Sequence, residues 1–370
     1  MSDKIMISIV MPVYNAAPFL AQCFDSILSQ QRVKFELLVV DDGSTDGSQD
    51  LCQRYAEGDS RIRLFRTDNR GPGAAKNLAL SHAQGDAAAF IDADDYFEPA
   101  ALQTLVAAWR ETGADFIRCE NRIFIDASHP PPNPAGIALS GPPQGKMPRE
   151  GLVDIGYVNG RPRVRYWNPC GSSMVSLGKV RQHGVRFNER MRQGEDGWFM
   201  LELAKIPLSY HYCDAVVYNW RRHGYNSITL TSLHPLERIA CKFFYYAELR
   251  KYLRSKIGTP LADRAIAHNY ASVFVEMVLL YGGWSGGANF DPAAKGIATA
   301  IVEPLLVGSM SDFTPTGWRE KAAKAFVRLG WARALALLGR HSAKNVIEGW
   351  SDFSGFDHKR IVDSDYTPFE

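Results

Sequence analysis

The chain has 370 residues, 46% of them hydrophobic, and a formal net charge of +2. A chain of this length can bury one large core or two smaller ones, so we expect one or two domains. The nearly balanced charge argues against a nucleic-acid binder that depends on overall basicity, and no nucleic-acid partner is expected.

The six cysteines are scattered without a CxxC pair, in a chain too long to need disulfide staples. We expect reduced, mostly buried thiols. The first residues lack the apolar core and cleavage site of a signal peptide, and no apolar run approaches the ~20 residues of a membrane span. These features predict a cytoplasmic protein, with peripheral contact on the inner face of the cell membrane left open.

The first hundred residues alternate between strand and helix patterns. Strands are predicted over residues 4–15, 35–44, 61–68 and 86–95, and helices over 16–30, 48–58 and 74–85. The first helix has one apolar face, made of Phe19, Leu20, Cys23, Phe24, Ile27 and Leu28. Ser44, Thr45 and Asp46 offer caps to the second helix. Apolar strands that alternate with helices predict a Rossmann-like α/β fold, a mainly parallel sheet with helices on both faces.

The rest of the chain changes character twice. A helix over 99–113 and a strand over 114–120 precede a proline-rich stretch, 127–150, which predicts a long loop, either a disordered insertion or a flap over the site. Short strands and a helix resume over 152–220. Amphipathic helices follow from about residue 232. We therefore expect a first domain over 1–230 and an α-helical C-terminal domain over 231–370.

The unusual chemistry lies where the predicted parallel strands end, which is where ligands bind in such sheets. Asp92 and Asp94 are two residues apart in an extended segment, so their carboxylates point the same way. Paired carboxylates suit Mg²⁺ or Mn²⁺, which they hold together with substrate phosphates. The pattern predicts a metal bound to a diphosphate. Asp95 is expected to cap the helix that begins near Pro99.

Other strand ends fit a nucleotide. Tyr14 offers an aromatic face to a base, and Asp42 offers an acceptor to a base N–H group. Lys76, at the start of a predicted helix, can reach a base carbonyl or a phosphate. Each signal is weak alone, but all three fall on one sheet edge.

The blocks MPVYNAAPFLAQCFDSILSQ, FELLVVDDGSTDGS, RGPGAAKNLAL, FIDADDYFEP and GEDGWF occur in this order. Together they resemble the family 2 glycosyltransferases of the GT-A fold, over residues 6 to about 228. The resemblance implies an inverting hexosyl- or N-acetylhexosaminyltransferase that uses a nucleoside diphosphate sugar, most often a UDP-sugar, with Mn²⁺ or Mg²⁺. It also implies a glycan or lipid-linked acceptor in bacterial surface-polysaccharide synthesis.

The resemblance assigns roles to individual residues. The implied catalytic base is Asp196, and the implied metal ligands are Asp94 and Asp92, with His223 as a possible third. The implied donor-side residues are Pro12, Val13, Tyr14, Asp42, Gly71, Lys76, Asp92, Ala93, Asp94, Arg222 and Ser227, with Arg221 as an alternative to Arg222. The implied acceptor-side residues are Glu195, Trp198, Cys170 and Gly171; Trp167, Trp198 and Tyr225 either stack on a sugar or belong to the core. The chain departs from the family at Lys76, where Arg is usual, so a fork-like contact becomes a point charge.

Competing classes fit less well. A Rossmann dehydrogenase requires G-x-G-x-x-G after the first strand, and a sugar nucleotidyltransferase requires a glycine-rich basic loop there; neither is present. A catalytically weak or inactive GT-A module that binds glycans or acts as a scaffold stays open as the alternative. The presence of Asp92, Asp94 and Asp196 together argues against it.

The C-terminal region carries a basic amphipathic pattern over residues 318–329. Such a helix can lie on an anionic membrane surface, which would suit a lipid-linked acceptor. It can equally pack on neighbouring helices or on a second copy of the chain, giving a homo-oligomer. Both interpretations stay open.

Overall fold

The computed structural model describes residues 5–129, 152–158, 161–166, 170–224, 235–262, 265–266 and 269. The chain divides into two compact units. The first comprises Met1–Asp154 and Arg165–Leu233, and the second comprises Ile155–Val164 and His234–Glu370. Of the second unit, the described part holds most of a two-stranded sheet, β7 (Val153–Val158) and β8 (Arg161–Tyr166), and the helix α7 (Pro235–Ile257).

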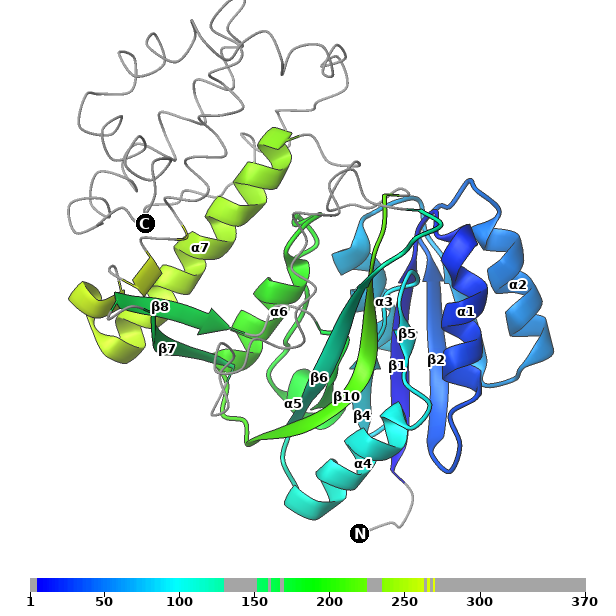
Figure 1. Cartoon of the computed structure of the whole chain (residues 1–370), viewed down its shortest axis with the longest axis horizontal. Helices are drawn as coiled ribbons and strands as arrows, with labels where there is room; N and C mark the ends of the chain where they lie inside the picture. The colour runs from blue at the N-terminus through cyan, green and yellow to red at the C-terminus, as the bar shows by residue number, and fades with distance from the viewer. Residues whose placement is uncertain are drawn as a thin grey trace, which may run out of the picture. The chain divides into compact units, whose positions relative to one another are not determined.

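The first unit is built on an eight-stranded sheet with the order β3-β2-β1-β4-β9-β6-β10-β5 (Figure 1). The strands are β1 (Met6–Val13), β2 (Lys34–Asp41), β3 (Ile62–Arg66), β4 (Ala87–Phe90), β5 (Tyr96–Phe97), β6 (Phe116–Ile125), β9 (Ser173–Ser176) and β10 (Tyr210–Arg222). β3, β2, β1 and β4 are parallel, β9 is antiparallel to β4 and β6, and β5 is antiparallel to β10. The expected mainly parallel sheet is confirmed, with antiparallel strands added in its second half.

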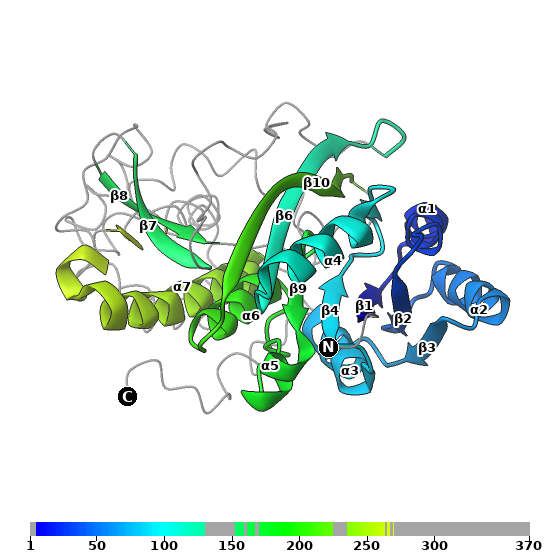
Figure 2. The ribbon, with the colours of Figure 1, turned by 90° about the horizontal axis from the view of Figure 1, so that it is seen from below.

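Helices cover both faces of this sheet (Figure 2). One face carries α1 (Ala17–Leu28), α2 (Ser48–Gly58) and α4 (Ala101–Thr112). The other face carries α3 (Pro72–His82), α5 (Leu177–Gln182) and α6 (Glu195–Ala204). This arrangement follows from strands that are apolar on both sides and need cover above and below.

The core forms as the apolar pattern predicts. In α1 the buried residues are Phe19, Leu20, Cys23, Phe24 and Ile27, the face that the sequence indicates. They pack with apolar side chains of the parallel strands, Ile7, Ile9 and Met11 of β1 among them. Each such side chain contributes roughly 1.5–3 kcal/mol by leaving water. All six cysteines are unpaired, and all but Cys213 are buried.

Two capping predictions are wrong. The residue that caps α2 is Gly47, at φ 93°, and Asp46 instead accepts a hydrogen bond from the Ser48 N–H at 3.0 Å. Helix α4 begins after Ala100 without a side-chain cap, and Asp95 has turned into the protein. The Asp95 side chain is taken by tertiary contacts with Tyr218 and Arg221, whereas Asp46 stays at the start of α2 but binds there from the position before the cap.

Several expectations fall outside the described residues. They include the proline-rich stretch from residue 130 onward, Trp167, Tyr225, Ser227 and the basic helix over 318–329. Within the described ranges, no helix is long and apolar enough to cross a membrane.

Candidate active site

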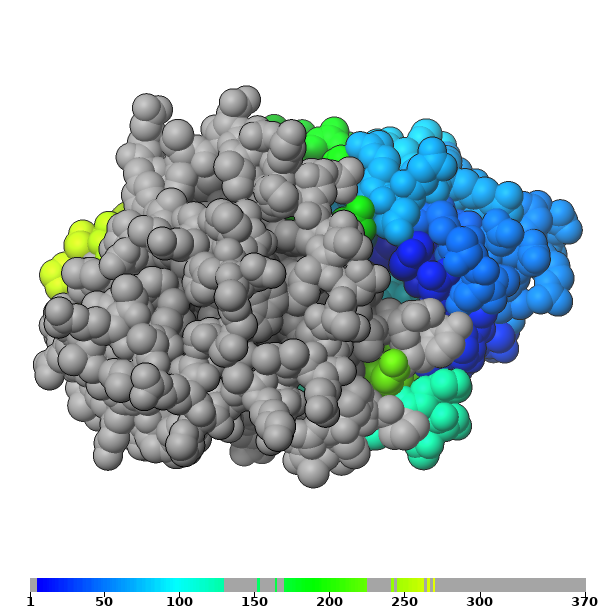
Figure 3. Space-filling model, turned by 90° about the horizontal axis from the view of Figure 1, so that it is seen from above, coloured from blue at the N-terminus to red at the C-terminus, as the bar shows by residue number. Residues whose placement is uncertain are grey.

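The strand ends that the sequence singles out meet at one edge of the sheet. Val13 of β1 lies opposite Asp41 of β2, and Val10 of β1 opposite Phe90 of β4, so the three strands end close together. The space-filling view from above shows blue surface from the N-terminal part of the chain beside small patches of green surface from the later chain (Figure 3). The first unit therefore brings separated sequence blocks to one place.

Asp42 organises the loop that connects β3 to α3. Its buried carboxylate accepts hydrogen bonds from the Thr67 hydroxyl at 2.5 Å, the Arg70 N–H at 2.8 Å and the Gly71 N–H at 2.7 Å. Gly71 has φ 95°, a backbone conformation that favours glycine, which lets its N–H turn toward this carboxylate. An ionised carboxylate has about four lone-pair sites, so Asp42 can accept one more donor.

Tyr14 stands at the end of β1 with its side chain toward solvent. It is 36% exposed, whereas Val13 before it is buried and Pro12 partly buried. Hydrogen bonds fix the turn after it, where Asn15 has φ 48°. The Asn15 N–H donates to the Ser44 hydroxyl oxygen at 3.0 Å, and the Asn15 side-chain oxygen accepts from the Thr45 N–H at 2.8 Å. An exposed aromatic ring on a fixed turn is free to stack on a ligand.

The loop after β4 holds Asp92, Asp94 and Asp95 and is called the acidic loop below. Its three carboxylates have different partners. Asp92 lies 3.4 Å from the Lys76 ammonium, and Asp94 Oδ2 lies 2.8 Å from Nε2 of His223. Asp95 is buried and accepts from the Tyr218 hydroxyl at 2.5 Å and from the Arg221 N–H at 2.7 Å. Burial, with Asp94 and Asp92 close by, raises the pKa of Asp95 well above its usual range. Asp95 is thus a structural acid.

Asp94 and His223 are the residues that fit a divalent cation. His223 is buried, its Nε2 faces Asp94, and its Nδ1 is buried without a hydrogen-bond partner. Carboxylate oxygen and imidazole nitrogen are both ligands of Mn²⁺. Across the described residues no group of three or more His, Cys, Asp or Glu side chains could hold a metal ion.

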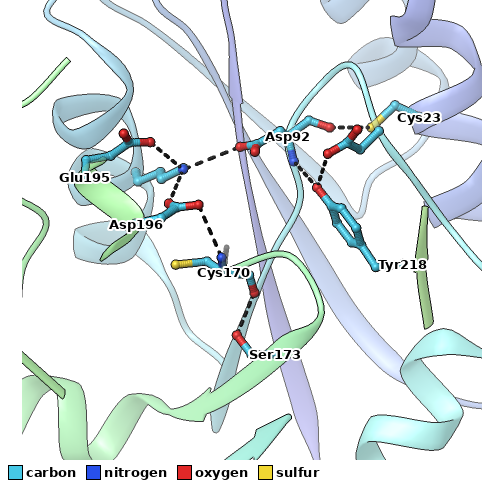
Figure 4. Close-up of polar contacts among 9 residues, drawn as sticks. Cys23, Asp92, Cys170, Ser173, Glu195, Asp196 and Tyr218 are labelled. Carbon is cyan, nitrogen blue, oxygen red and sulfur yellow. Dashed lines mark hydrogen bonds and ion pairs between the residues drawn. The ribbon is translucent and has the colours of Figure 1, made fainter. Parts of the chain in front are cut away.

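Asp196 lies in the first turn of α6, close to the acidic loop (Figure 4). Its Oδ1 is 2.6 Å from the Lys76 Nζ, and its Oδ2 accepts from the backbone N–H of Cys170 at 3.2 Å. Gly194, at φ 81°, occupies the position before the helix and sets its start. Asp196 is held from two sides and still has part of its surface exposed.

Glu195 shares the same ammonium, with its Oε1 3.0 Å from the Lys76 Nζ. Burial raises the pKa of Glu195 to about 7; Lys76 opposes the rise, while Asp196 and Asp92 add to it. Burial also raises the pKa of the Cys170 thiol well above its usual range, with Asp196 adding to the rise, so the thiol stays protonated. The loop before β9 therefore offers Asp196 a backbone donor and a neutral neighbour.

The remaining candidates lie at varied distances from this cluster. Ala93 is buried within the acidic loop. Gly171 is buried against the ring of Tyr218, and Trp198 is partly buried on α6. The guanidinium of Arg222 lies over the Trp220 ring at 5.0 Å.

Arg221 has a structural environment. It is buried, it pairs with Asp126 and Gln22, and its Nε donates to the Asp94 carbonyl at 2.7 Å. Neighbouring residues on a strand face opposite sides, which separates Arg221 from Arg222. Arg221 therefore holds the acidic loop from within the fold.

Sequence reasoning missed two contacts. Tyr218, in the middle of β10, donates to Asp95, and its oxygen also accepts from the Asp92 N–H at 3.3 Å. The Lys76 ammonium is buried and forms ion pairs with three carboxylates, those of Asp92, Glu195 and Asp196. The signal for Lys76 was present, because it follows Ala74 and Ala75 in a helix of small residues that indicates close packing.

Residues 8–150 match the family model described as Glycosyl transferase family 2. Solved structures share the fold: S. aureus TarS in complex with UDP has a TM-score of 0.57 at 17% identity, covering 95% of both chains. A mannosyltransferase, PcManGT from Pyrobaculum calidifontis, in complex with GDP-Man and Mn²⁺, has a TM-score of 0.50 at 16% identity and covers 91% of this chain and 88% of that one. The family match covers residues 8–150, and the likeness to these solved structures shows that the chain shares their GT-A fold.

Curated relatives agree with this class. The glycosyltransferase GlyG of Streptococcus pneumoniae is 36% identical over 113 residues, which are 30% of this chain and 38% of GlyG. The succinoglycan biosynthesis protein ExoU of Rhizobium meliloti is 32% identical over 203 residues, which are 51% of this chain and 54% of ExoU. The matches thus span well under two thirds of these relatives.

Proposed function

We propose that this chain is an inverting, metal-dependent glycosyltransferase. It would move a sugar from a nucleoside diphosphate sugar, with a UDP-sugar as the favoured donor, to a hydroxyl of a glycan or lipid-linked acceptor. The observation that carries the proposal is the meeting of two distant motifs. Asp92 of the acidic loop and Asp196 of α6 lie 3.4 Å and 2.6 Å from one ammonium, that of Lys76. Bacterial surface-polysaccharide synthesis is the proposed setting, in line with relatives such as ExoU.

The donor would lie along the edge made by Tyr14, Asp42 and the acidic loop. The exposed Tyr14 ring would stack on the base, and the remaining acceptor site of Asp42 would take a base N–H group. Asp94 and His223 would hold the divalent cation against the diphosphate. Such a cation, when bound, offsets the negative charge that grows on the leaving diphosphate.

Asp196 would act as the general base. An inverting transfer requires the acceptor hydroxyl to attack from the face opposite the leaving group, so the base must lie across the sugar from the diphosphate. Asp196 lies on α6, whereas the Asp94–His223 pair lies at the ends of β4 and β10, and the Asp196 carboxylate is partly exposed. It would take the hydroxyl proton as the glycosidic bond forms and as the bond to the diphosphate breaks.

The donor is tested first by thermal shift with UDP-, GDP- and dTDP-sugars in the presence of Mn²⁺. A ligand that binds only the native state raises the unfolding temperature by mass action, and we expect a UDP-sugar to give the largest shift. No shift with any nucleotide sugar would contradict the proposed donor class.

The base is tested with Asp196→Asn. Loss of a general base typically lowers the rate ~10²- to 10⁴-fold, and we expect such a loss in donor hydrolysis or transfer with the nucleotide-induced thermal shift kept. The matched control is Asp214→Asn, an exposed acid of β10. Retention of more than about half the activity in Asp196→Asn would contradict the assignment. A wild-type protein that binds a glycan without any turnover would support the scaffold alternative instead.

A further inference from the structure

Lys76 is a fully buried cation with three acidic neighbours. Its side chain, on α3, is 2% exposed. Its Nζ lies 2.6 Å from Asp196, 3.0 Å from Glu195 and 3.4 Å from Asp92. Figure 4 labels these three carboxylates and marks the contacts with dashed lines that meet at one nitrogen. A lysine ammonium has three N–H donors, and here each has a carboxylate within reach.

This placement differs from the donor-side role that the position suggests. With three carboxylates around Nζ, no N–H is left over for a base carbonyl or a phosphate. The side chain is also closed in, because the Phe187 ring lies 5.4 Å from Nζ and Asn77 is bound to the Phe187 backbone at 2.9 Å and 3.0 Å. Lys76 therefore faces α6 and the proposed base.

The charges explain why a cation is needed there. Three carboxylates this close together cannot all stay ionised in a partly buried site without a positive partner. The effect is visible at Glu195, where burial and the acidic neighbours raise the pKa to about 7 although Lys76 lowers it. The titratable or charged groups that face Asp196 are Lys76, Glu195, Asp92, Cys170 and Arg118. Of these, Lys76 is the cation in direct contact with its carboxylate.

We propose that Lys76 is a positioning residue that holds the Asp196 carboxylate in place, and that it connects the proposed base to the acidic loop through Asp92. The inference rests on the proposed function, in which Asp196 is the base. The inference explains why residue 76 is Lys where Arg is usual. A compact ammonium can lie between three carboxylates, whereas a planar guanidinium fork is suited to one carboxylate or phosphate.

The first test is the pH dependence of kcat for wild type, Lys76→Met and Lys76→Arg. In Lys76→Met we expect kcat at neutral pH to fall at least about tenfold, with KM for the nucleotide sugar nearly unchanged. We also expect the acid limb of the kcat–pH profile, the side on which kcat falls as pH falls, to move to higher pH by about one unit or more. Lys76→Arg keeps the charge, so its acid limb should stay near that of wild type while kcat falls because the carboxylates are displaced.

A second measurement does not depend on turnover. Infrared difference spectra between Lys76→Met and wild type, recorded at about pH 8, where Glu195 is ionised in the wild type, should show a new C=O band from a protonated carboxyl. The band should weaken in the double variant Lys76→Met/Asp196→Asn. If circular dichroism shows that Lys76→Met does not fold, the inference is judged on Lys76→Arg against wild type. An unmoved acid limb with a lower kcat supports it, and a raised KM for the nucleotide sugar overturns it.

Each failure has its own signature. A raised KM for the nucleotide sugar with an unmoved acid limb would overturn the inference, because Lys76 would then act on the donor. The absence of a new infrared band in folded Lys76→Met would also overturn it. A wild-type protein inactive with every nucleotide sugar would contradict the proposed function, while the infrared comparison would still judge the role of Lys76.

Discussion

Gly171 shows how closely the fold is built around the site. A Cβ at this position would lie 2.3 Å from the ring of Tyr218, and Tyr218 in turn holds Asp95. The absence of a side chain at residue 171 is therefore a condition for the contact between β10 and the acidic loop. The glycine is needed here for close approach rather than for an unusual φ angle.

Substitution of Gly171 by Ala should destabilise the protein. The methyl group would push Tyr218 away and weaken its hydrogen bond to Asp95, at a cost of ~2–3 kcal/mol. Urea unfolding measures the loss. Gly58→Ala is the matched control, because a Cβ there meets nothing within 4 Å. Equal stability of the two variants would show that the ring can move aside freely.

The Asp94–His223 pair makes a prediction about metal. If these residues hold a divalent cation, Asp94→Ala and His223→Ala should each lose the Mn²⁺-dependent part of the nucleotide-induced thermal shift, and chelation with EDTA should abolish activity of the wild type. His82→Ala, on the far end of α3 where the ring stacks on Phe65, serves as a control. Full activity in EDTA would contradict a metal-dependent reaction.

The residue types at the site could be predicted from the sequence, but not all of their partners. Carboxylates at the end of an apolar strand, and a separate acid in GEDGWF, indicate the two halves of the site. Which half Lys76 serves depends on how α6 docks against α3, a contact between segments far apart in the chain. Local sequence carries no signal for that direction.

At the scale of elements, Glu36 of β2 connects three neighbours. Its buried carboxylate accepts from the Ser8 hydroxyl of β1 at 2.7 Å, from the Gln84 N–H at 2.6 Å and from Arg63 of β3 at 2.9 Å. Burial would raise the pKa of Glu36, but these hydrogen bonds and the charge of Arg63 outweigh it, and the pKa lies below its usual value. One side chain thus ties the parallel half of the sheet together.

Glu36→Gln should lower the free energy of unfolding by ~2 kcal/mol at neutral pH, because hydrogen bonds to a charged group are replaced by weaker ones. A carboxyl whose pKa is lowered on folding contributes stability above its unfolded pKa and loses it as pH falls through the folded pKa. The difference from wild type should therefore shrink below about pH 4. Urea unfolding across this range measures it, with exposed Glu57→Gln as control. A difference that is constant with pH would contradict the assignment.

The elements themselves were predictable to different degrees. Apart from β5, the helices and strands up to residue 120 follow from apolar periodicity, and α1 buries the face that the pattern indicates. β9 is four residues, SMVS, too short for any pattern, and its antiparallel pairing with β4 and β6 depends on contacts distant in the chain. The failed capping assignments have the same origin, since tertiary hydrogen bonds outcompete a helix end for Asp95.

At the scale of the whole molecule, the chain passes between the two compact units more than once. Residues Ile155–Val164 group with the unit that begins at His234, although they lie inside the first unit in sequence. The sequence predicted a single boundary near residue 230, because composition changes there, whereas a ten-residue excursion leaves no trace in composition. The boundary near 230 stays a prediction for how the chain divides in solution.

A chain that ends after Leu233 should keep nucleotide binding but aggregate, because Ile155–Val164 loses the unit with which it groups. A second variant, with Ile155–Val164 replaced by a flexible glycine-serine linker in the same truncated chain, should recover a monodisperse protein. Light scattering and the nucleotide-induced thermal shift measure the two properties. If both truncated chains lose nucleotide binding, the first unit does not fold independently.

The order of strands in the sheet also governs how the protein emerges from the ribosome. β10 lies between β6 and β5, so the edges of β6 and β5 have no partner until residue 222 has been made. At typical synthesis rates the interval after β6 is complete lasts roughly 5 to 20 s. For that time the nascent chain presents open strand edges, which are sites of unwanted pairing. Production of this protein should therefore be sensitive to translation speed and to chaperones that shield strand edges.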